Sequence, residues 1–596
     1  MSAHAITPPS HLAGRPGWQP TNLNGWAVLL SPGMELTPPP PLPRPFRLKI
    51  LHLNDLHGHI AYLTAAGHEP LFARIAGRLS HLRQRYANDP QTAVLFLSAG
   101  DDTAGSVFDE LWSESGEPGG IHAGYRLYSA AGLDAAVLGN HDLDMGAARL
   151  AQAIQREAAF PLLSANLHAP PPLAQHVYAA AILCLKGVRV GLIGLTTPAH
   201  LNCAQVTITD PLAAARELVA VLRPFCHVLI LLSHLGYSLE SATAAVSGVG
   251  DVELARQLAP GSLDLIIGGH THLPLNEQGL NRRHIVNEVP IVQAGALGRF
   301  LGEVTLTVQE KAMVTDARLT PTALLPVDDL FEATAVAPLL AHIRPFFQRR
   351  LGQVINHPDL SPEAVHNDFA AGESALANFI TAGLMARAQA HNLPADFALI
   401  DASVVGDGLP VGDLTFADWF ALMPYADTLR LCRLTGWQVW ALLQDNARRL
   451  DMPREHHVER GFLHFSEQLR YTIYTGPQRG NNHADDSWLN GRPLLAQLEQ
   501  VFTAVVPSFW RQLARSWEGF ARSEGVPLVN PAGFAHQDTG LFLRRELVAY
   551  IAEMDGVNEM GGARRDGRLR ILPASQPTEF WSIHAHRHVF HQPALP

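Results

Sequence analysis

Five short clusters of Asp, Asn and His residues stand out in this 596-residue sequence, because each follows an apolar run of strand length. The first cluster is Asn54-Asp55-Leu56-His57-Gly58. An Asp and a His two residues apart at the end of a strand point the same way, and they offer one ion a carboxylate and an imidazole ligand. A single pair of this kind is weak evidence, since such residues are also common in turns.

The next two clusters add groups that the first one lacks. Gly100-Asp101 provides a carboxylate with close backbone approach, which suits a ligand shared by two cations. The third cluster reads Gly139-Asn140-His141-Asp142-Leu143-Asp144. The amide oxygen of Asn140 can bind a metal, while His141 faces a substrate and Asp144 holds its other ring nitrogen.

Histidines carry the last two clusters, Ser233-His234-Leu235-Gly236 and Gly268-Gly269-His270-Thr271-His272. Two histidines that flank one residue in a Gly-rich turn can reach two ions. Since α/β sheets build their sites at the C-terminal ends of strands, five clusters in that position predict one shared metal site.

The elements that must position these clusters follow an α/β pattern. From Phe46 onward, amphipathic segments such as 71–86 alternate with the apolar runs RLKILHL, AVLFLS, AAVLG, RVGLIGL, HVLILLS, LDLIIGG and PIVQAG. Short apolar runs rich in β-branched residues predict strands of a largely buried sheet. The first large domain is therefore expected to be α/β.

The length of the chain predicts more than one domain, because a single hydrophobic core stops growing well below 596 residues. We expect helices at 374–391 and 437–450 and strands at 396–400 and 469–474, which indicate a second domain of α+β type. The predicted parts are a Pro-rich N-terminal arm (1–45), the α/β domain (46–325), a linker helix (326–356), the α+β domain (357–575) and a tail (576–596).

Composition narrows the class of protein. The apolar fraction of 47% and the charged fraction of 17% are those of a soluble globular protein. The net charge of −11, without a Lys/Arg cluster, argues against binding to nucleic acid. No run approaches the roughly 20 apolar residues of a membrane span, and no signal-peptide pattern is visible, so a cytoplasmic location is expected. The four scattered cysteines predict buried thiols.

In their order, the five clusters resemble the signatures D-x-H, G-D, G-N-H-(D/E), H and G-H-x-H of the calcineurin-like metallophosphoesterases, specifically the 5′-nucleotidase branch. The resemblance spans residues 47–305 and implies a four-layer sandwich of helices around a two-sheet core. It implies two divalent metal ions (Mn, Zn, Co, Fe or Mg) that activate water for attack on phosphorus. The implied ligands are Asp55, His57, Asp101 and His272 for one ion and Asp101, Asn140, His234 and His270 for the other; His141 and Asp144 match the catalytic dyad.

A weaker resemblance, over residues 357–572, is to the 5′-nucleotidase C-terminal domain, which binds a nucleoside between two aromatic rings. Tyr425 and Phe509 fall at the matching positions, although core packing is an equally common role for such rings, and Glu518 stands near a family Asp. Where the family reads N-G-G-G-I-R, this chain reads Asp401-Ala402-Ser403-Val404-Val405-Gly406. The Asn and Arg that grip the substrate are therefore missing.

Three functions remain open. The first is a metal-dependent phosphomonoesterase of nucleotidase type, acting in nucleotide catabolism or on another small phosphoester. The second is hydrolysis of another ester with the same metals, such as a cyclic nucleotide, a sugar diphosphate or a sulfur-oxyanion conjugate. The third is a noncatalytic binding protein, which the presence of all seven ligand positions and both dyad residues disfavours.

Overall fold

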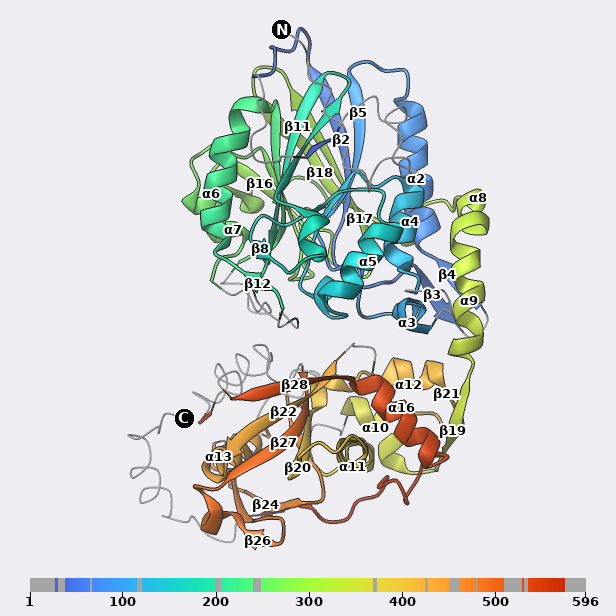
Figure 1. Cartoon of the computed structure of the whole chain (residues 1–596), viewed down its shortest axis with the longest axis vertical. Coiled ribbons are helices and arrows are strands. Elements are labelled where there is room, and N and C mark those ends of the chain that lie inside the picture. Colours follow the sequence, from blue (N-terminus) through green and yellow to red (C-terminus); the bar gives the residue numbers. More distant parts are fainter. Residues whose placement is uncertain are drawn as a thin grey trace. The chain divides into compact units, whose positions relative to one another are not determined.

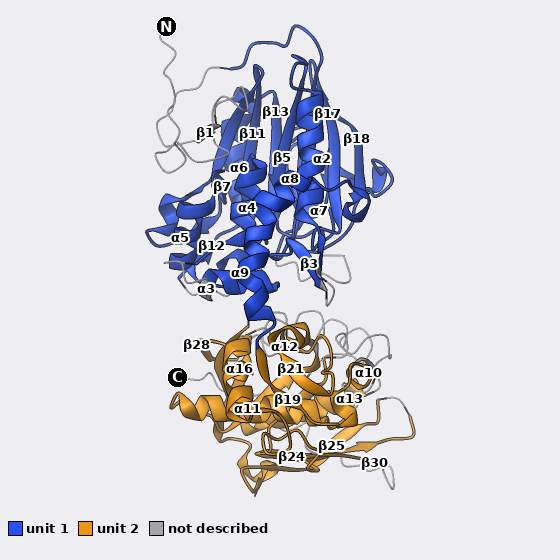
Figure 2. Ribbon diagram, turned by 90° about the vertical axis from the view of Figure 1, so that its right-hand side faces the viewer, with its two compact units in different colours: residues 1–349, 424–426 blue, residues 350–423, 427–596 orange. Residues whose placement is uncertain are grey.

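Two compact units make up the computed structural model: residues 1–349 with 424–426, and residues 350–423 with 427–596 (Figure 2). Each unit is considered by itself. The residues that the structure describes are 27–29, 38–64, 67–114, 120–198, 203, 205–238, 248–367, 372–423, 427–450, 461–478, 480–508, 528–529 and 534–573.

The first unit contains two seven-stranded sheets (Figure 1). One has the order β18 (Ala312–Pro321), β17 (Phe300–Val308), β2 (Phe46–Leu53), β5 (Thr92–Ser98), β6 (Ala135–Val137), β7 (Leu162–Leu163) and β9 (Val177–Tyr178). The other has the order β1 (Ala27–Leu29), β10 (Ala180–Leu185), β11 (Val188–Thr196), β13 (Val228–His234), β14 (Leu265–Gly268), β16 (Val289–Val292) and β15 (Ile285–Val286). Strands β2, β5 and β6 run parallel, and so do β11, β13, β14 and β16.

The two sheets face each other across a shared apolar core. Leu48 and Leu95 of one sheet and Leu192 and Ile230 of the other belong to it. A second core lies between the β11–β14 sheet and the helices α6 (Pro211–Leu222) and α7 (Asp251–Gln257). On the other side, the helices that cover the β2–β5 sheet are α2 (Phe72–Arg85), α4 (Ala123–Ala131) and α5 (Ala147–Glu157). The predicted four-layer sandwich is thus confirmed.

Full burial explains the apolar character of the central strands. Every residue of β5 and of β13 is buried, because each strand is covered on both faces. On the helical side, the ring of Tyr128 from α4 packs edge-on against Phe72 of α2 and Phe96 of β5, with ring centroids 5.3 Å and 5.8 Å apart. These contacts fix the helical layer on the sheet.

Lys186 joins the two sheets at the turn between β10 and β11. Its ammonium group donates to four main-chain carbonyl oxygens, those of Tyr86 (2.9 Å), Ala87 (3.3 Å), Asp89 (2.7 Å) and Thr92 (2.9 Å). These carbonyls belong to the segment between α2 and β5, and to the first residue of β5. The side chain therefore links the β10–β11 turn of one sheet to the segment that joins α2 and β5 in the other half of the sandwich.

The predicted linker helix (326–356) is shorter than expected. Helical structure runs through α8 (Asp329–Phe331), a π-helical turn (Glu332–Val336) and α9 (Ala337–Phe347), and residues Arg350–Val354 then form strand β19. At Gly352 a Cβ would lie 2.4 Å from the main-chain nitrogen of Gly556. This close approach requires glycine and belongs to the strand pairing of β19 with β29 (Gly556–Val557).

The second unit is α+β, as predicted. Its largest sheet has the order β23 (Leu463–Phe465), β20 (Phe397–Asp401), β27 (Val501–Pro507), β22 (Thr428–Thr435) and β28 (His536–Phe542). Smaller sheets are formed by β26 (Arg492–Pro493), β25 (His483–Leu489), β24 (Leu469–Thr475) and β30 (Leu569–Pro573), and by β21 (Gly412–Thr415), β19 and β29. The helices are α10 (Pro362–Asn367), α11 (Ala375–Ala390), α12 (Phe416–Leu422), α13 (Gly436–Arg449) and α16 (Leu543–Glu553).

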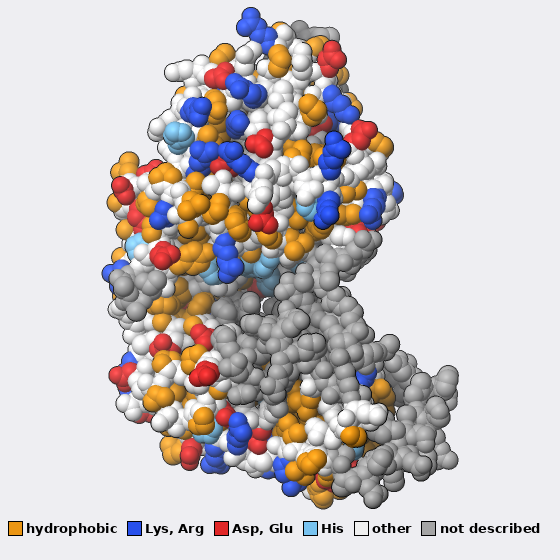
Figure 3. Space-filling view, turned by 180° about the vertical axis from the view of Figure 1, so that it is seen from behind, with side chains coloured by type: hydrophobic (Ala, Val, Ile, Leu, Met, Phe, Trp, Pro, Cys, Tyr) orange, Lys and Arg blue, Asp and Glu red, His pale blue; other side chains and the backbone are white. Residues whose placement is uncertain are grey.

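The surface carries charges of both signs. On the face shown in Figure 3, the Lys and Arg side chains are interspersed with Asp and Glu instead of forming one continuous patch. Among the helices that the structure describes, none combines the length and the apolar character needed to cross a membrane.

Candidate metal centre

All five polar clusters follow the C-terminal ends of strands in the first unit. Clusters one to three follow the parallel neighbours β2, β5 and β6, and clusters four and five follow or end the parallel neighbours β13 and β14. Main-chain pairing continues past the end of β2, where Asp55 N donates to Gly100 O (2.8 Å) and His57 N donates to Asp101 O (2.9 Å). The strand order therefore brings distant parts of the sequence to one place.

Six of the predicted ligands form two groups. Within each group, the ligand atoms all lie within 4.8 Å of one another. The first group is Asp55, His57 and His272, and the second is Asp101, His234 and His270. In the first, His272 Nε2 lies 3.3 Å from Asp55 Oδ1 and 3.1 Å from His57 Nε2. In the second, His234 Nε2 lies 3.0 Å from Asp101 Oδ2.

Hydrogen bonds on the far side of the rings fix the orientation of two histidines. His57 Nδ1 donates to Ala104 O (2.7 Å), and His234 Nδ1 donates to Ala99 O (2.6 Å). Each bond leaves Nε2 to face the carboxylates, which is how metal-binding imidazoles are usually held. The structure thus fixes the tautomer that a metal ion requires.

Asn140 provides the clearest test of whether the site suits metals. The residue is fully buried, and neither its side-chain oxygen nor its side-chain nitrogen has a hydrogen-bond partner among the residues that the structure describes. A buried amide without partners is costly. A cation bound to the amide oxygen accounts for the missing partner. A cation also accounts for the facing Nε2 atoms of His57 and His272, because two ring nitrogens cannot both donate to each other.

The electrostatics of the cluster favour cations. Burial alone would raise the pKa of Asp55, but the charge and hydrogen bond of His272 outweigh burial and lower the pKa to about 2. Burial also opposes ionisation of Asp101, yet the charges of His234 and His141 hold its pKa well below the usual range. Both carboxylates are therefore ionised at neutral pH, as metal binding requires.

His141 and Asp144 form the predicted pair, with His141 Nδ1 2.7 Å from Asp144 Oδ2. Burial alone would lower the pKa of His141, but the charges of Asp144 and Asp101 outweigh it and raise the pKa to about 10. These two carboxylates therefore favour the protonated imidazole. The main-chain nitrogen of His141 also donates to Asp101 Oδ1 (2.8 Å), which places the pair beside the second group.

Five of the seven predicted ligands adopt left-handed backbone conformations. The φ values are 50° for Asp55, 49° for His57, 53° for Asp101, 73° for His270 and 56° for His272. Residues other than glycine adopt this region at a cost of roughly 1–2 kcal/mol, and such strain concentrates at functional sites. The surrounding hydrogen bonds must therefore hold these loops in place.

Two of the residues that hold the loops had no role in the prediction. Asp142 accepts five hydrogen bonds, from Gly139 N (2.9 Å), Asp101 N (3.1 Å), Asp102 N (3.0 Å), Thr103 N (3.1 Å) and Thr103 Oγ1 (2.8 Å). Asn54 donates to Asp55 Oδ2 (2.7 Å) and Gly295 O (2.5 Å), and accepts from Ala294 N (2.6 Å). Their places inside the first and third clusters were the available signal.

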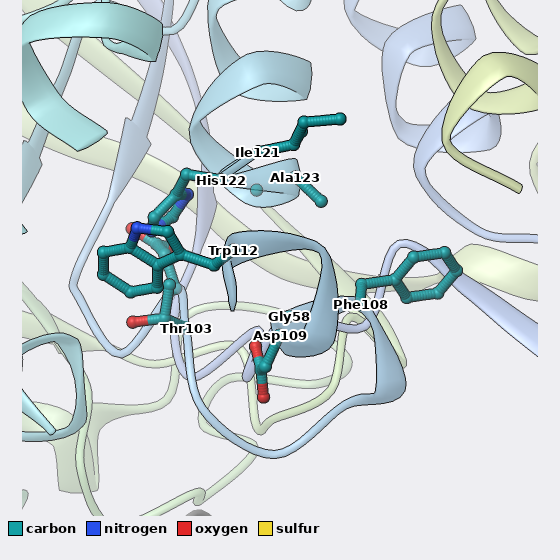
Figure 4. Close-up of a pocket in the computed structure, with 10 residues that line it drawn as sticks. Gly58, Thr103, Phe108, Asp109, Trp112, Ile121, His122 and Ala123 are labelled. Atoms are coloured by element: carbon teal, nitrogen blue, oxygen red, sulfur yellow. The ribbon is translucent and has the colours of Figure 1, made fainter. Parts of the chain in front are cut away.

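A small cavity of about 10 Å³ lies behind the loop that carries Asp101, lined by Gly58 and Thr103 among others (Figure 4). Trp112 and His122 also line it, and neither Trp112 Nε1 nor His122 Nε2 has a partner among the described residues. Because Tyr125 N donates to His122 Nδ1 (3.0 Å), the proton of the neutral ring is on Nε2. Two donors and this volume suit one water molecule.

The predicted substrate residues Tyr425, Phe509 and Glu518 lie outside the described residues. The segment in place of the family's N-G-G-G-I-R is described for the most part. Asp401 is 1% exposed, and Ala402, Val404 and Val405 are also buried. Asp401 therefore stands where the family has the Asn, and Gly406, which is exposed and has no side chain, stands where the family has the Arg.

The two-sheet sandwich, the two Asp/His groups at its strand ends and the adjacent His–Asp pair define a metal-dependent phosphoesterase with a dinuclear site. Residues 48–274 match the family described as calcineurin-like phosphoesterase, and residues 354–522 match the 5′-nucleotidase C-terminal domain. The chain belongs to the 5′-nucleotidase family.

Individual proteins resemble this chain in sequence or in fold. A 5′-nucleotidase of Vibrio vulnificus is 25% identical over 528 residues, covering 82% of this chain and 88% of that protein. The crystal structure of a 5′-nucleotidase precursor from Thermus thermophilus has a TM-score of 0.55 at 22% identity and covers 89% of this chain and 100% of that one. The sulfate thiohydrolase SoxB of the same organism has a TM-score of 0.51 at 17% identity, covering 90% and 99%.

Proposed function

We propose that the chain hydrolyses small phosphomonoesters, nucleoside monophosphates included, at the site formed by the five clusters. The observation that carries the proposal is the pair of Asp/His groups beside the His141–Asp144 pair. We assign Asp55, His57, Asp101 and His272 to one ion and Asp101, Asn140, His234 and His270 to the other. When bound, two divalent ions supply Lewis acidity to the phosphoryl oxygens and to the attacking water.

His141 has a separate task in this proposal. Asp144 occupies its Nδ1, so Nε2 is left to face the substrate. A protonated imidazole at this place stabilises the charge that develops on the phosphoryl group, or gives its proton to the leaving alkoxide. Asp144 keeps the ring oriented and charged.

Recognition of nucleotides is expected to be weak. The Asn and Arg that grip the substrate in the family are absent from residues 401–406, where Asp401 and Gly406 stand at their positions. Binding energy from such remote groups lowers the barrier only where the groups exist. A charge-assisted hydrogen bond contributes about 1.5–3 kcal/mol, so two missing contacts raise the KM for AMP by about two orders of magnitude or more.

The same absence favours a second candidate, an ester other than a nucleotide. The likeness to SoxB supports the proposal that this site can serve a sulfur-oxyanion conjugate, and cyclic nucleotides and sugar diphosphates are further candidates. The metal groups and the His141–Asp144 pair are common to all of these reactions. The candidates differ in the reacting group and in what binds beyond it.

A substrate panel tests both candidates. The purified protein, reconstituted separately with Mn²⁺, Zn²⁺, Co²⁺ and Mg²⁺, would be assayed with p-nitrophenyl phosphate, AMP, a cyclic nucleotide, a sugar diphosphate and a cysteine S-sulfonate. We expect metal-dependent turnover of p-nitrophenyl phosphate and poorly saturating turnover of AMP. No turnover of any ester with any metal would contradict the proposal. A KM for AMP in the low micromolar range would contradict weak nucleotide recognition.

A further inference from the structure

Gln293 follows strand β16 and is fully buried beneath the loop that carries His270 and His272. Its side-chain nitrogen donates to Gly269 O (2.6 Å). Its side-chain oxygen accepts from Thr271 Oγ1 (2.9 Å) and from Leu273 N (2.7 Å). One carboxamide thus binds three residues of this loop.

The three bonded residues alternate with the two histidines. Gly269, Thr271 and Leu273 are held, while His270 and His272 lie between them with φ values of 73° and 56°. A backbone that is fixed on both sides of each left-handed residue cannot relax to the right-handed form. Because the contacts need one donor and one acceptor at the same place, an apolar side chain of equal length cannot replace the amide.

The two histidines belong to different groups. His272 lies with Asp55 and His57, and His270 lies with Asp101 and His234. If the loop relaxed, both imidazoles would move together. The carboxamide therefore acts on both groups at once, although it touches neither histidine ring.

We propose that Gln293 is a positioning residue that holds His270 and His272 so that each reaches its own metal ion. The inference rests on the two-metal function proposed above. It assigns to Gln293 a role in metal affinity beyond fold stability, because its bonds go to the residues that set the direction of both rings.

The test is the Gln293→Met variant of the full chain, which keeps the length of the side chain and removes all three hydrogen bonds. Zn²⁺ affinity would be measured at both sites by competition with a chromophoric chelator, and the absorption spectrum of bound Co²⁺ would report the ligand geometry. We expect roughly 10–100-fold weaker binding of both ions, the usual effect of losing a group that orients metal ligands. The Co²⁺ spectrum should change as well.

A matched control is Gln444→Met in the second unit. Gln444 is 2% exposed, donates to Ala484 O (2.6 Å) and accepts from Ala484 N (3.0 Å), so the same change removes buried hydrogen bonds away from the histidines. It should lower the unfolding temperature of the metal-free protein and leave Zn²⁺ affinity and the Co²⁺ spectrum unchanged. Equal losses of affinity in the two variants would overturn the proposal, since stability alone would then explain both.

A milder variant keeps the test decisive if Gln293→Met does not fold. Thr271→Val removes two hydrogen bonds, the one from Thr271 Oγ1 to Gln293 and the one that Thr271 Oγ1 accepts from Tyr237 N (3.2 Å), and it leaves the other two bonds of Gln293 in place. The variant should weaken the binding of both ions by about 3–10-fold, a fraction of the effect of losing the whole amide. Wild-type affinity and spectrum in this folded variant would contradict the positioning role. Fewer than two ions in the wild-type protein would instead count against the proposed function.

Discussion

The strand ends of the first unit and the segment after β20 in the second are both buried, but they are buried in different ways. At the strand ends, polar side chains are packed densely and form hydrogen bonds with neighbouring main-chain groups, as Asp142 and Asn54 show. At the second, residues 402, 404 and 405 are apolar and lie below 3% exposure. The difference separates two tasks: the residues assigned to the chemistry are all present, whereas the Asn and Arg that grip a nucleotide in the family are absent from residues 401–406.

Replacement of Asp101 by Ala should have the largest effect. The carboxylate is assigned to both ions and contacts His234 Nε2 and His141 N. We expect the loss of more than one equivalent of bound metal and a fall in kcat of at least about 10³-fold, because Lewis acidity is lost at both ions. Elemental analysis and turnover of p-nitrophenyl phosphate measure this. An Asp101→Ala protein that keeps two ions and normal activity would refute the bridging role.

His141→Asn should lower kcat nearly as much without loss of metal. The variant removes the protonated ring and leaves Asn140, the neighbouring assigned ligand, in place. The expected loss of turnover is about 10²–10⁴-fold, the usual contribution of a positioned acid–base group. Metal content is the second measurement. If metal and activity fall in proportion, His141 is a ligand and the assigned role is wrong.

A change in the second unit should affect stability and leave catalysis intact. Val405 is fully buried, so Val405→Ala should lower the free energy of unfolding by about 2–3 kcal/mol through lost apolar contacts and a residual cavity. Denaturant titration measures the loss. The kcat for p-nitrophenyl phosphate should be unchanged in the folded variant. A lowered kcat with normal stability would show that this segment takes part in the reaction after all.

The smallest expected effect is that of Lys186→Met. The variant keeps the aliphatic stem and removes the ammonium group that four carbonyls accept from. Because the site is partly exposed and water can replace some of these bonds, we expect a loss of about 1–2 kcal/mol of stability. Metal content should stay at the wild-type value. A variant as stable as the wild type would show that water satisfies the four carbonyls fully.

The buried strands and the polar clusters that follow them could be predicted from local patterns in the sequence, whereas the four-layer arrangement was implied by the resemblance to a family. Strands such as β5 and β13 are continuous apolar runs, and each cluster directly follows one of them. The end of the linker helix was harder to predict. The close approach of Gly352 to Gly556 joins residues far apart in the chain, and helical spacing carries no trace of it.

The roles of the supporting residues Asp142 and Gln293 were also hard to predict, because they depend on partners that are distant in the sequence. Asp142 lies inside a cluster, but its five bonds depend on how the loop after β5 folds around it. The sequence does not single out Gln293, since its three partners lie 20 to 24 residues earlier in the chain. A side chain that satisfies a distant backbone has no fixed spacing in sequence.

The left-handed conformations of the assigned ligands have an evolutionary consequence. Glycine adopts positive φ at little cost, so at Asp55, His57, Asp101, His270 and His272 a mutation to glycine would relieve backbone strain while it removes a ligand. Selection for stability and selection for catalysis therefore oppose each other at these five positions. This chain has Asp or His at all five positions.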